Sequence, residues 1–202
     1  MDSSKLQYGE YYHIYNRGNN GETLFKEQLN YTLFLELYVK YITCIADTLA
    51  YCLMSNHFHI IVRIKEEKEI ETFSNLKMFV DKNNDVNKKP TPSSQFSHLF
   101  NAYTKSINTA YQRTGSLFEH PFKRKIIETE LYVQQSIAYV HNNPIKHSFV
   151  KKMYEYKWSS FNAILSIKPS RINRDLVISI FGNKEYFLQY HGEFIEESCE
   201  PY

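Results

Sequence analysis

The chain has 202 residues but only three cysteines, and no two of them form a CxxC pair. Because Cys44, Cys52 and Cys199 are odd in number and lack metal-site spacing, they predict neither a disulfide framework nor a thiolate zinc site. The sequence also lacks the roughly 18 to 20 continuous apolar residues of a membrane-spanning helix. Its polar start, MDSSKLQYGEYY, has no apolar centre of a signal peptide. We therefore expect a cytoplasmic protein with no membrane partner.

The chain also has little excess charge of either sign, since 24 basic and 22 acidic residues leave a formal net charge of only +2. This value alone does not indicate a nucleic-acid partner. Residues 101–160 nevertheless carry nine basic against four acidic side chains, whereas the rest of the chain is slightly acidic. Solvated surface explains most runs of this kind. The basic residues of this segment form two clusters interleaved with aromatic residues, and they are Lys123, Arg124 and Lys125 in the first and Lys146, Lys151, Lys152 and Lys157 in the second.

Hydrophobic periodicity predicts alternating strands and helices. Alternation of apolar and polar residues predicts strands over residues 11–16, 49–56, 57–64 and 117–128. Apolar spacings of three and four predict helices over residues 26–45, 69–80, 96–110 and 128–144. The last of these is predicted to end at Asn142, Asn143 and Pro144. The polar, proline-containing residues 81–94 are predicted to form a mobile loop.

This order of elements is typical of a ferredoxin-like α+β fold, an antiparallel sheet with helices packed on one face. The other face of such a sheet can meet a ligand. We expect residues 1–160 to form one domain and residues 161–202, which show short helical patterns, to form a helical C-terminal extension.

The stretch LMSNHFHIIV, residues 53–62, places two histidines in an otherwise apolar run. Successive side chains of a strand alternate faces, so His57 and His59 point the same way while Phe58 points to the other side. Two imidazoles on one face can hold one metal ion. An isolated pair of this kind is more often a pair of ordinary strand histidines, so the metal interpretation needs a third ligand from elsewhere.

The segment SIAYVHNNP offers such a ligand together with a reactive group. Tyr139 and Asn143 are four residues apart, so they lie only about 40° from each other around a helix and one turn apart. One helix face could thus present a phenol and an amide oxygen together. The alternative is that Tyr139 fills the core and Asn143 caps the helix before Pro144.

Three segments together resemble a known family. NHFHIIV, followed some eighty residues later by YVHNNPIKH and then by YKWSS, resembles the REP-associated tyrosine transposases, a branch of the single-tyrosine HUH transposase superfamily. The segments YHIYNRG and GSLFEHPFK fit the same branch. The resemblance covers roughly residues 8–160.

The resemblance implies a metal-dependent transposase that cleaves and rejoins single-stranded DNA beside hairpins through a 5′-phosphotyrosine. It makes His57, His59 and Asn143 the ligands of a divalent ion, Mg²⁺ or Mn²⁺, and Tyr139 the nucleophile. His141, between Tyr139 and Asn143, could compete as a ligand. A homodimer with exchanged tyrosine helices is possible. The candidates for phosphate contacts are Arg17, Lys123, Arg124, Lys125, Lys151 and Lys152.

Two other functions remain open on the sequence. A replication initiator or relaxase has the same histidine pair and tyrosine chemistry, although the YVHNNP and KWSS segments argue against it. A noncatalytic sheet could instead bind single-stranded nucleic acid through its aromatic residues, without a metal ion. Convergence of His57, His59 and Asn143, with the Tyr139 hydroxyl facing the same cavity, separates the catalytic functions from the noncatalytic one.

Overall fold

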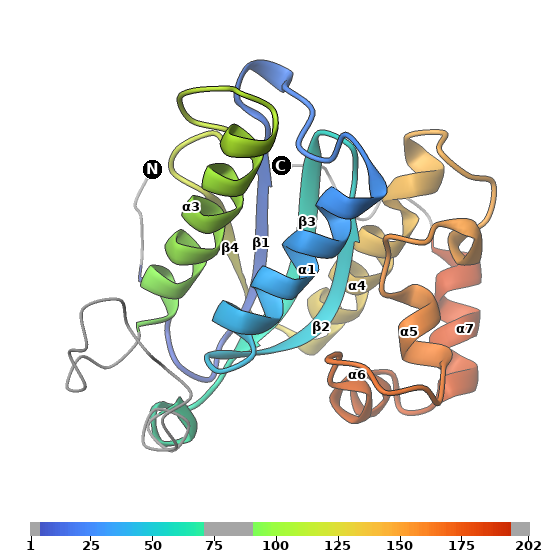
Figure 1. Ribbon diagram of the computed structural model, residues 1–202. Helices are drawn as coiled ribbons and strands as arrows, with labels where there is room; N and C mark the ends of the chain where they lie inside the picture. Colours follow the sequence, from blue (N-terminus) through green and yellow to red (C-terminus); the bar gives the residue numbers. More distant parts are fainter. Residues whose placement is uncertain (1–4, 71–90, 195–202) are drawn as a thin grey trace.

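A four-stranded antiparallel sheet forms the centre of the protein (Figure 1). The computed structural model describes residues 5–70 and 91–194. The sheet order is β2–β3–β1–β4, and its strands are β1 (Tyr11–Arg17), β2 (Ala46–Leu53), β3 (His57–Ile64) and β4 (Lys123–Ile127). With α1 (Gln28–Ile42) after β1 and α3 (Pro92–Ala110) after β3, the chain has the βαββαβ order of a ferredoxin-like fold. The predicted α+β class is confirmed.

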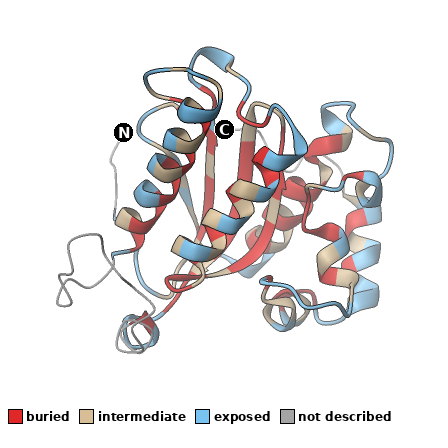
Figure 2. Ribbon diagram, viewed as in Figure 1, coloured by how far each residue is buried: buried red, intermediate tan, exposed pale blue. Residues whose placement is uncertain are grey.

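The helices α1 and α3 cover one face of this sheet. Alternate side chains of the two central strands point toward them and are fully or almost fully buried: Tyr12, Ile14, Phe58, Ile60 and Val62. Burial is concentrated along the strands and on the inner sides of the two helices (Figure 2). A continuous apolar core therefore fixes which side of β1 and β3 faces away from α1 and α3.

The opposite face is covered in part by α4 (Glu130–Lys146), which lies behind the sheet in Figure 1. The helices α5 (Phe161–Leu165), α6 (Arg174–Phe181) and α7 (Lys184–Glu193) pack around α4 beside β2. Short 3₁₀ turns stand at η1 (Asn19–Gly21) and η2 (Met153–Glu155). The expectation of helices on one face therefore holds for α1 and α3, while α4 and the extension occupy much of the other.

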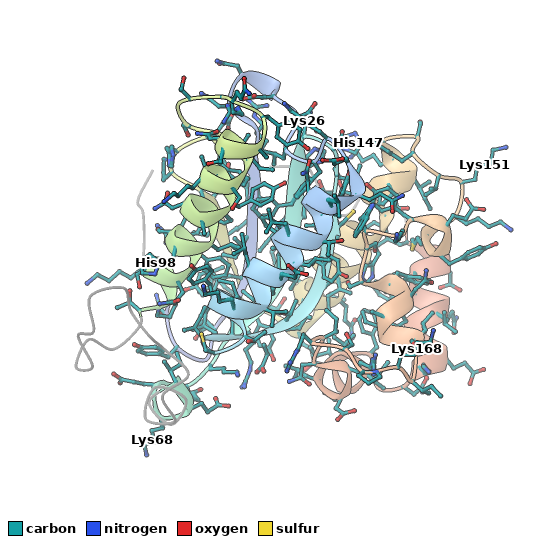
Figure 3. The ribbon with its side chains drawn as sticks, viewed as in Figure 1. Lys26, Lys68, His98, His147, Lys151 and Lys168 are labelled. Carbon is teal, nitrogen blue, oxygen red and sulfur yellow. The ribbon has the colours of Figure 1, made fainter. Side chains whose placement is uncertain are left out.

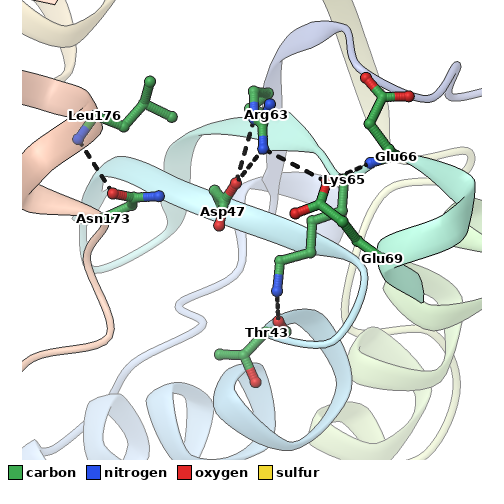
Figure 4. A network of polar contacts seen from close by, with 8 residues as sticks. All are labelled: Thr43, Asp47, Arg63, Lys65, Glu66, Glu69, Asn173 and Leu176. Carbon is green, nitrogen blue, oxygen red and sulfur yellow. Dashed lines mark hydrogen bonds and ion pairs between the residues drawn. The ribbon is translucent and has the colours of Figure 1, made fainter. Parts of the chain in front are cut away.

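An ion pair between β2 and β3, at the opposite end of β3 from His57, supports the register of these two strands. Arg63 of β3 lies opposite Asp47 of β2, and Arg63 Nη2 donates to Asp47 Oδ2 over 2.9 Å. Nearby, Lys65 Nζ donates to the Thr43 carbonyl at 2.8 Å (Figure 4). Since a slip of one residue would turn every side chain of a strand to the other face, these contacts also help to keep His59 on its side of the sheet.

Several element boundaries differ from the sequence predictions: β2 is Ala46–Leu53 rather than 49–56, and β4 covers only Lys123–Ile127 of the predicted strand 117–128. Two further differences concern helices. α4 does not end at Pro144 but continues to Lys146, with His147 as its C-cap and Pro144 inside the helix. Helical hydrogen bonding resumes at once, because His147 N donates to the Asn143 carbonyl at 3.0 Å. Burial of Asn143 and Pro144 outweighs the one hydrogen bond that a proline removes.

The second difference concerns the predicted loop 81–94, because α3 begins at Pro92. Thr91 Oγ1 accepts a hydrogen bond from Ser94 N at 3.3 Å, and a proline at the first helical position suits the start of a helix. Residues 81–90 and nearly all of the predicted helix 69–80 lie outside the described residues.

The C-terminal extension is attached to α4 through a buried histidine. His141 of α4 is fully buried, with its Nδ1 2.9 Å from His191 Nε2 of α7 and its Nε2 2.8 Å from Ser160 Oγ. Ser160 in turn pairs with the edge of β2, since its backbone N–H donates to the Tyr51 carbonyl at 2.9 Å. The YVHNNP and KWSS segments are therefore joined in space by one hydrogen-bond network.

Cys44 and Cys52 are buried free thiols, and Cys199 lies outside the described residues. None of the helices in the described part of the chain has the length and apolar character needed to cross a membrane.

We expect His191→Ala to lower the free energy of unfolding by about 1 to 3 kcal/mol, because it leaves His141 Nδ1 buried without its partner. Urea denaturation followed by circular dichroism measures this change. His98→Ala is the matched control, since His98 is an exposed histidine of α3 (Figure 3). Equal stability of both variants would show that the His141 network does not hold the extension.

Candidate functional site

The two histidines of the LMSNHFHIIV stretch lie at the start of β3, on the face turned away from α1 and α3. The ring centroids of His57 and His59 are 5.3 Å apart. Phe58 between them points to the other face, where its ring lies 5.2 Å from that of Phe34. His59 is buried, whereas His57 is half-buried. The side chains alternate as predicted, so both imidazoles border the same space.

α4 passes over these two histidines. The Tyr139 ring lies 5.7 Å from that of His59, and the His147 ring lies 5.2 Å from that of His57. Tyr139 and His147 are eight residues apart, and Asn143 stands midway, one turn from each on the same side of the helix. The two ring contacts therefore bracket Asn143, which lies on the side of the helix that faces the histidine pair.

The Asn143 side chain is fully buried, and its amide is only half satisfied. Its Nδ2 donates to the Tyr139 carbonyl at 2.9 Å, while Oδ1 has no hydrogen-bond partner among the described residues. A buried carbonyl oxygen left without a partner costs about 1 to 3 kcal/mol. Because Asn143 lies inside α4, it does not serve as the helix cap that the sequence offered as an alternative. Its oxygen is suited to bind a cation.

His57 is held with one ring nitrogen toward the protein. Its Nδ1–H donates to Asn56 Oδ1 at 2.7 Å, which leaves the lone pair on Nε2. Burial lowers the pKa of His57 to about 4, and the neighbouring His147 and Arg17 act in the same direction. His57 is therefore neutral at physiological pH, the form in which an imidazole binds metal ions.

His59 is surrounded by other rings. Burial holds the pKa of His59 well below its ordinary value, and His13, His57 and His147 add to this effect. His13 Nε2 lies 2.9 Å from His59 Nδ1, and the Tyr15 ring stacks on His59 with centroids 5.9 Å apart. His59 is thus also neutral and cannot turn freely.

The arrangement limits how an ion could be held. Within residues 5–70 and 91–194, no three His, Cys, Asp or Glu side chains are grouped so that they could hold a metal ion. An ion at the histidine pair would need a ligand of another type, and the unpartnered Asn143 Oδ1 fits this need. Two imidazoles and one amide oxygen suit a divalent cation and leave positions open for phosphate oxygens. This set does not distinguish Mg²⁺ from Mn²⁺.

His141, considered as a competing ligand, is not available to the site. Both of its ring nitrogens are engaged, with His191 and Ser160, away from the histidine pair.

Sequence reasoning missed His13 and His147 as neighbours of the pair. His147 had a signal, because it follows Tyr139 by eight residues on the same helix face. For His13 the sequence contained only an incomplete signal. Strand alternation groups it with Tyr11 and Tyr15, but only the pairing of β1 with β3, in which Tyr15 lies opposite His59, brings it to the site.

The predicted phosphate-binding residues separate into two groups. Lys123 and Lys125 lie opposite Tyr15 and His13 in the β1–β4 register, so they share the face of the histidine pair. Arg17 lies opposite His57 and forms an ion pair with Glu119. These three basic residues surround the candidate site.

The other three predicted contacts lie elsewhere. Arg124 points to the opposite face, where its Nη1 donates to Ser93 Oγ at 3.2 Å and its guanidinium lies over the Phe122 ring. Lys151 and Lys152 are exposed in the segment after α4, with Lys151 at the outer edge of the molecule (Figure 3). Lys146, which was not among the predicted phosphate contacts, lies near the candidate nucleophile. Its Nζ is 5.9 Å from the centre of the Tyr139 ring.

Comparison with known proteins gives one distant structural likeness. No family model matches the chain, and no curated protein matches it. Among solved structures, the chain is similar to a REP-associated tyrosine transposase bound to a REP hairpin, with a TM-score of 0.58 and 14% sequence identity. The match covers 84% of this chain and 89% of that chain. At this identity the likeness shows a shared fold.

The buried neutral histidines predict acid sensitivity. Burial lowers the pKa of His13 to about 3, helped by the Lys125 charge, and burial lowers that of His191 to about 4. Histidines of an unfolded chain titrate near pH 6.5, so below that value the unfolded state binds protons that the folded state does not. The contribution of these histidines to the free energy of unfolding is complete above about pH 6.5. It falls toward pH 4, by up to about 1.4 kcal/mol per pH unit for each such histidine.

Urea denaturation at neutral pH and near pH 5 measures this effect. His191→Phe should reduce the difference between the two conditions, whereas His98→Phe should leave it unchanged. A chain equally stable at both pH values would contradict the buried neutral state of these residues.

Proposed function

We propose that the chain is a metal-dependent transposase that cuts and rejoins single-stranded DNA through a covalent 5′-phosphotyrosine at Tyr139. The observation that carries the proposal is the position of α4. It brings Tyr139 against His59 and places Asn143, whose buried Oδ1 has no hydrogen-bond partner among the described residues, one turn farther along the same side of the helix. The shared fold with a transposase bound to a REP hairpin supports the same function.

In this proposal His57 Nε2, His59 and Asn143 Oδ1 hold a divalent ion, Mg²⁺ or Mn²⁺. The ion supplies Lewis-acid polarisation of the scissile phosphate. Tyr139 then forms a bond from its phenolic oxygen to phosphorus while the bond from phosphorus to the 3′ oxygen breaks. The phenol loses its proton, and the departing oxygen gains one to become a 3′-hydroxyl. The Lys146 charge, near the Tyr139 ring, favours the negative charge that develops on the phenol.

The phosphotyrosine ester keeps the phosphodiester energy, so a 3′-hydroxyl can attack it and rejoin the strand without a nucleotide cofactor. The substrate is single-stranded at the cut. Tyr139 is only 8% exposed and His59 only 9%, so a base-paired backbone would not reach between the sheet and α4. Arg17, Lys123 and Lys125 contact the phosphates of the strand, and a hairpin beside the cut serves for recognition.

The two competing functions explain fewer features of the described residues. An open aromatic platform, as in RNA-recognition modules, would need a bare sheet face, but α4 covers part of this one, including the histidine pair. An initiator or relaxase would use the same chemistry, and no feature of the described residues favours it. Tyr139 meets His59 within one chain, so an exchange of helices in a homodimer is not required.

Tyr139→Phe should keep DNA binding but reduce the covalent adduct below detection, because the ring remains and the attacking oxygen is lost. The assay incubates labelled single-stranded DNA hairpins with the protein and Mg²⁺ or Mn²⁺ and runs denaturing gels. Tyr132→Phe is the control. Tyr132 is on the same helix but roughly 10 Å farther along its axis, at 1.5 Å per residue. An adduct mapped to Tyr132 instead of Tyr139 would overturn the site.

The two groups of basic residues predict different salt dependence of binding. Replacing both Lys123 and Lys125 with alanine should reduce the slope of log affinity against log salt by about 1.4, roughly 0.7 for each lost phosphate contact with a single strand. Arg124→Ala, between them in sequence but on the other face, should leave the slope unchanged. Equal effects of the two changes would place the DNA path elsewhere.

A further inference from the structure

His13 is a fully buried histidine that the proposed reaction does not use. It lies in β1, and its Nε2 is 2.9 Å from Nδ1 of His59 in the adjacent strand β3. Its ring centroid is 4.9 Å from that of Tyr15, 5.0 Å from His59 and 6.2 Å from Tyr139. His13 therefore packs against both the candidate nucleophile and one candidate ligand, and it makes a directed polar contact with the latter.

A hydrogen bond between two neutral imidazoles contains a single proton, so only two arrangements are possible. In the first, His59 Nδ1–H donates to His13 Nε2, and His59 keeps a lone pair on its own Nε2. In the second, His13 Nε2–H donates to His59 Nδ1, and the proton of His59 sits on Nε2. Only the first arrangement leaves His59 Nε2 able to bind a cation.

The neighbouring histidine indicates which arrangement applies. His57 Nδ1 contacts Asn56 Oδ1, and an amide oxygen can only accept, so His57 has its proton on Nδ1 and its lone pair on Nε2. In both histidines the protein forms a polar contact at Nδ1, and no hydrogen bond to Nε2 is found among the described residues. The two side chains are thus arranged alike, with Asn56 behind one and His13 behind the other.

We propose that His13 is a positioning residue that accepts the His59 Nδ1–H and so fixes both the tautomer and the ring orientation of His59, with Nε2 toward the ion. The consequence for metal binding rests on the proposed function, whereas the tautomer itself is a property of the metal-free chain. In this proposal His13 acts on the site through His59, because its Nε2 is engaged with His59 Nδ1.

The tautomer is measured directly by long-range ¹H–¹⁵N correlation spectra of the metal-free, ¹⁵N-labelled protein at a pH slightly above 7. The signals of His59 are assigned by their loss in His59→Asn. We expect a protonated Nδ1 and an unprotonated Nε2 at His59. A protonated Nε2 would overturn the proposal, whatever the activity of the protein.

Two variants of His13 then separate a directed hydrogen bond from simple packing. His13→Phe keeps a ring of similar size but has no acceptor, while His13→Gln has a side-chain oxygen that can accept. Calorimetric titration with Mn²⁺ should show about 10- to 100-fold weaker binding for His13→Phe, the usual loss when a partner of a metal ligand is removed. His13→Gln should restore binding to within a few-fold of the wild type, and His98→Phe should have no effect.

Equal losses in His13→Phe and His13→Gln, with both variants unfolding cooperatively, would show that His13 only fills space and would overturn the proposal. If either variant does not fold, the wild-type spectrum still decides the question. A wild type that shows the Nδ1–H tautomer but binds no Mn²⁺ would support the role of His13 and contradict the proposed function, so the two failures are distinguishable.

Discussion

The packing of α4 across the second face of the sheet is the contact on which the candidate site depends. Neither β3 nor α4 has a complete set of groups, since the histidines belong to one and the phenol and amide to the other. A rotation of α4 by one residue, about 100°, would turn Tyr139 and Asn143 away from β3. Buried Ile137 and Val140 fix that rotation against the sheet, and His141 fixes it against Ser160 and His191. The C-terminal extension is therefore part of what orients the site.

The electrostatic character of the site follows from the burial of neutral groups. His13, His57 and His59 are uncharged because desolvation disfavours the protonated ring. A ligand set of two imidazoles and an amide has no negative charge, so a bound divalent ion would keep its full charge for phosphate oxygens. The basic residues Lys123 and Lys125 on the same face add to this positive field. Both features suit a polyanionic substrate better than a neutral one.

Local patterns predicted much of the chain correctly, and two departures from them have different causes. The spacing of Tyr139 and Asn143 correctly predicted one helix face, but the proline rule wrongly ended that helix at Pro144. Arg124 was grouped with two lysines by sequence, although strand alternation puts it on the opposite face. Burial of Asn143 outweighed the local rule at Pro144, whereas the side of Arg124 follows from strand alternation itself, which grouping the three basic residues by sequence left out.

The sequence by itself determined the relations that depend on backbone period. It placed His57 and His59 on one side of a strand, Tyr139 and Asn143 on one side of a helix, and the elements in ferredoxin-like order. Only the tertiary structure decided which faces meet. The sheet order brings β1 beside β3, so that His13 reaches a histidine 46 residues later, and the packing of α4 puts its polar edge over that pair. Such contacts depend on strand register and on apolar packing between distant segments, and no local periodicity encodes either of them.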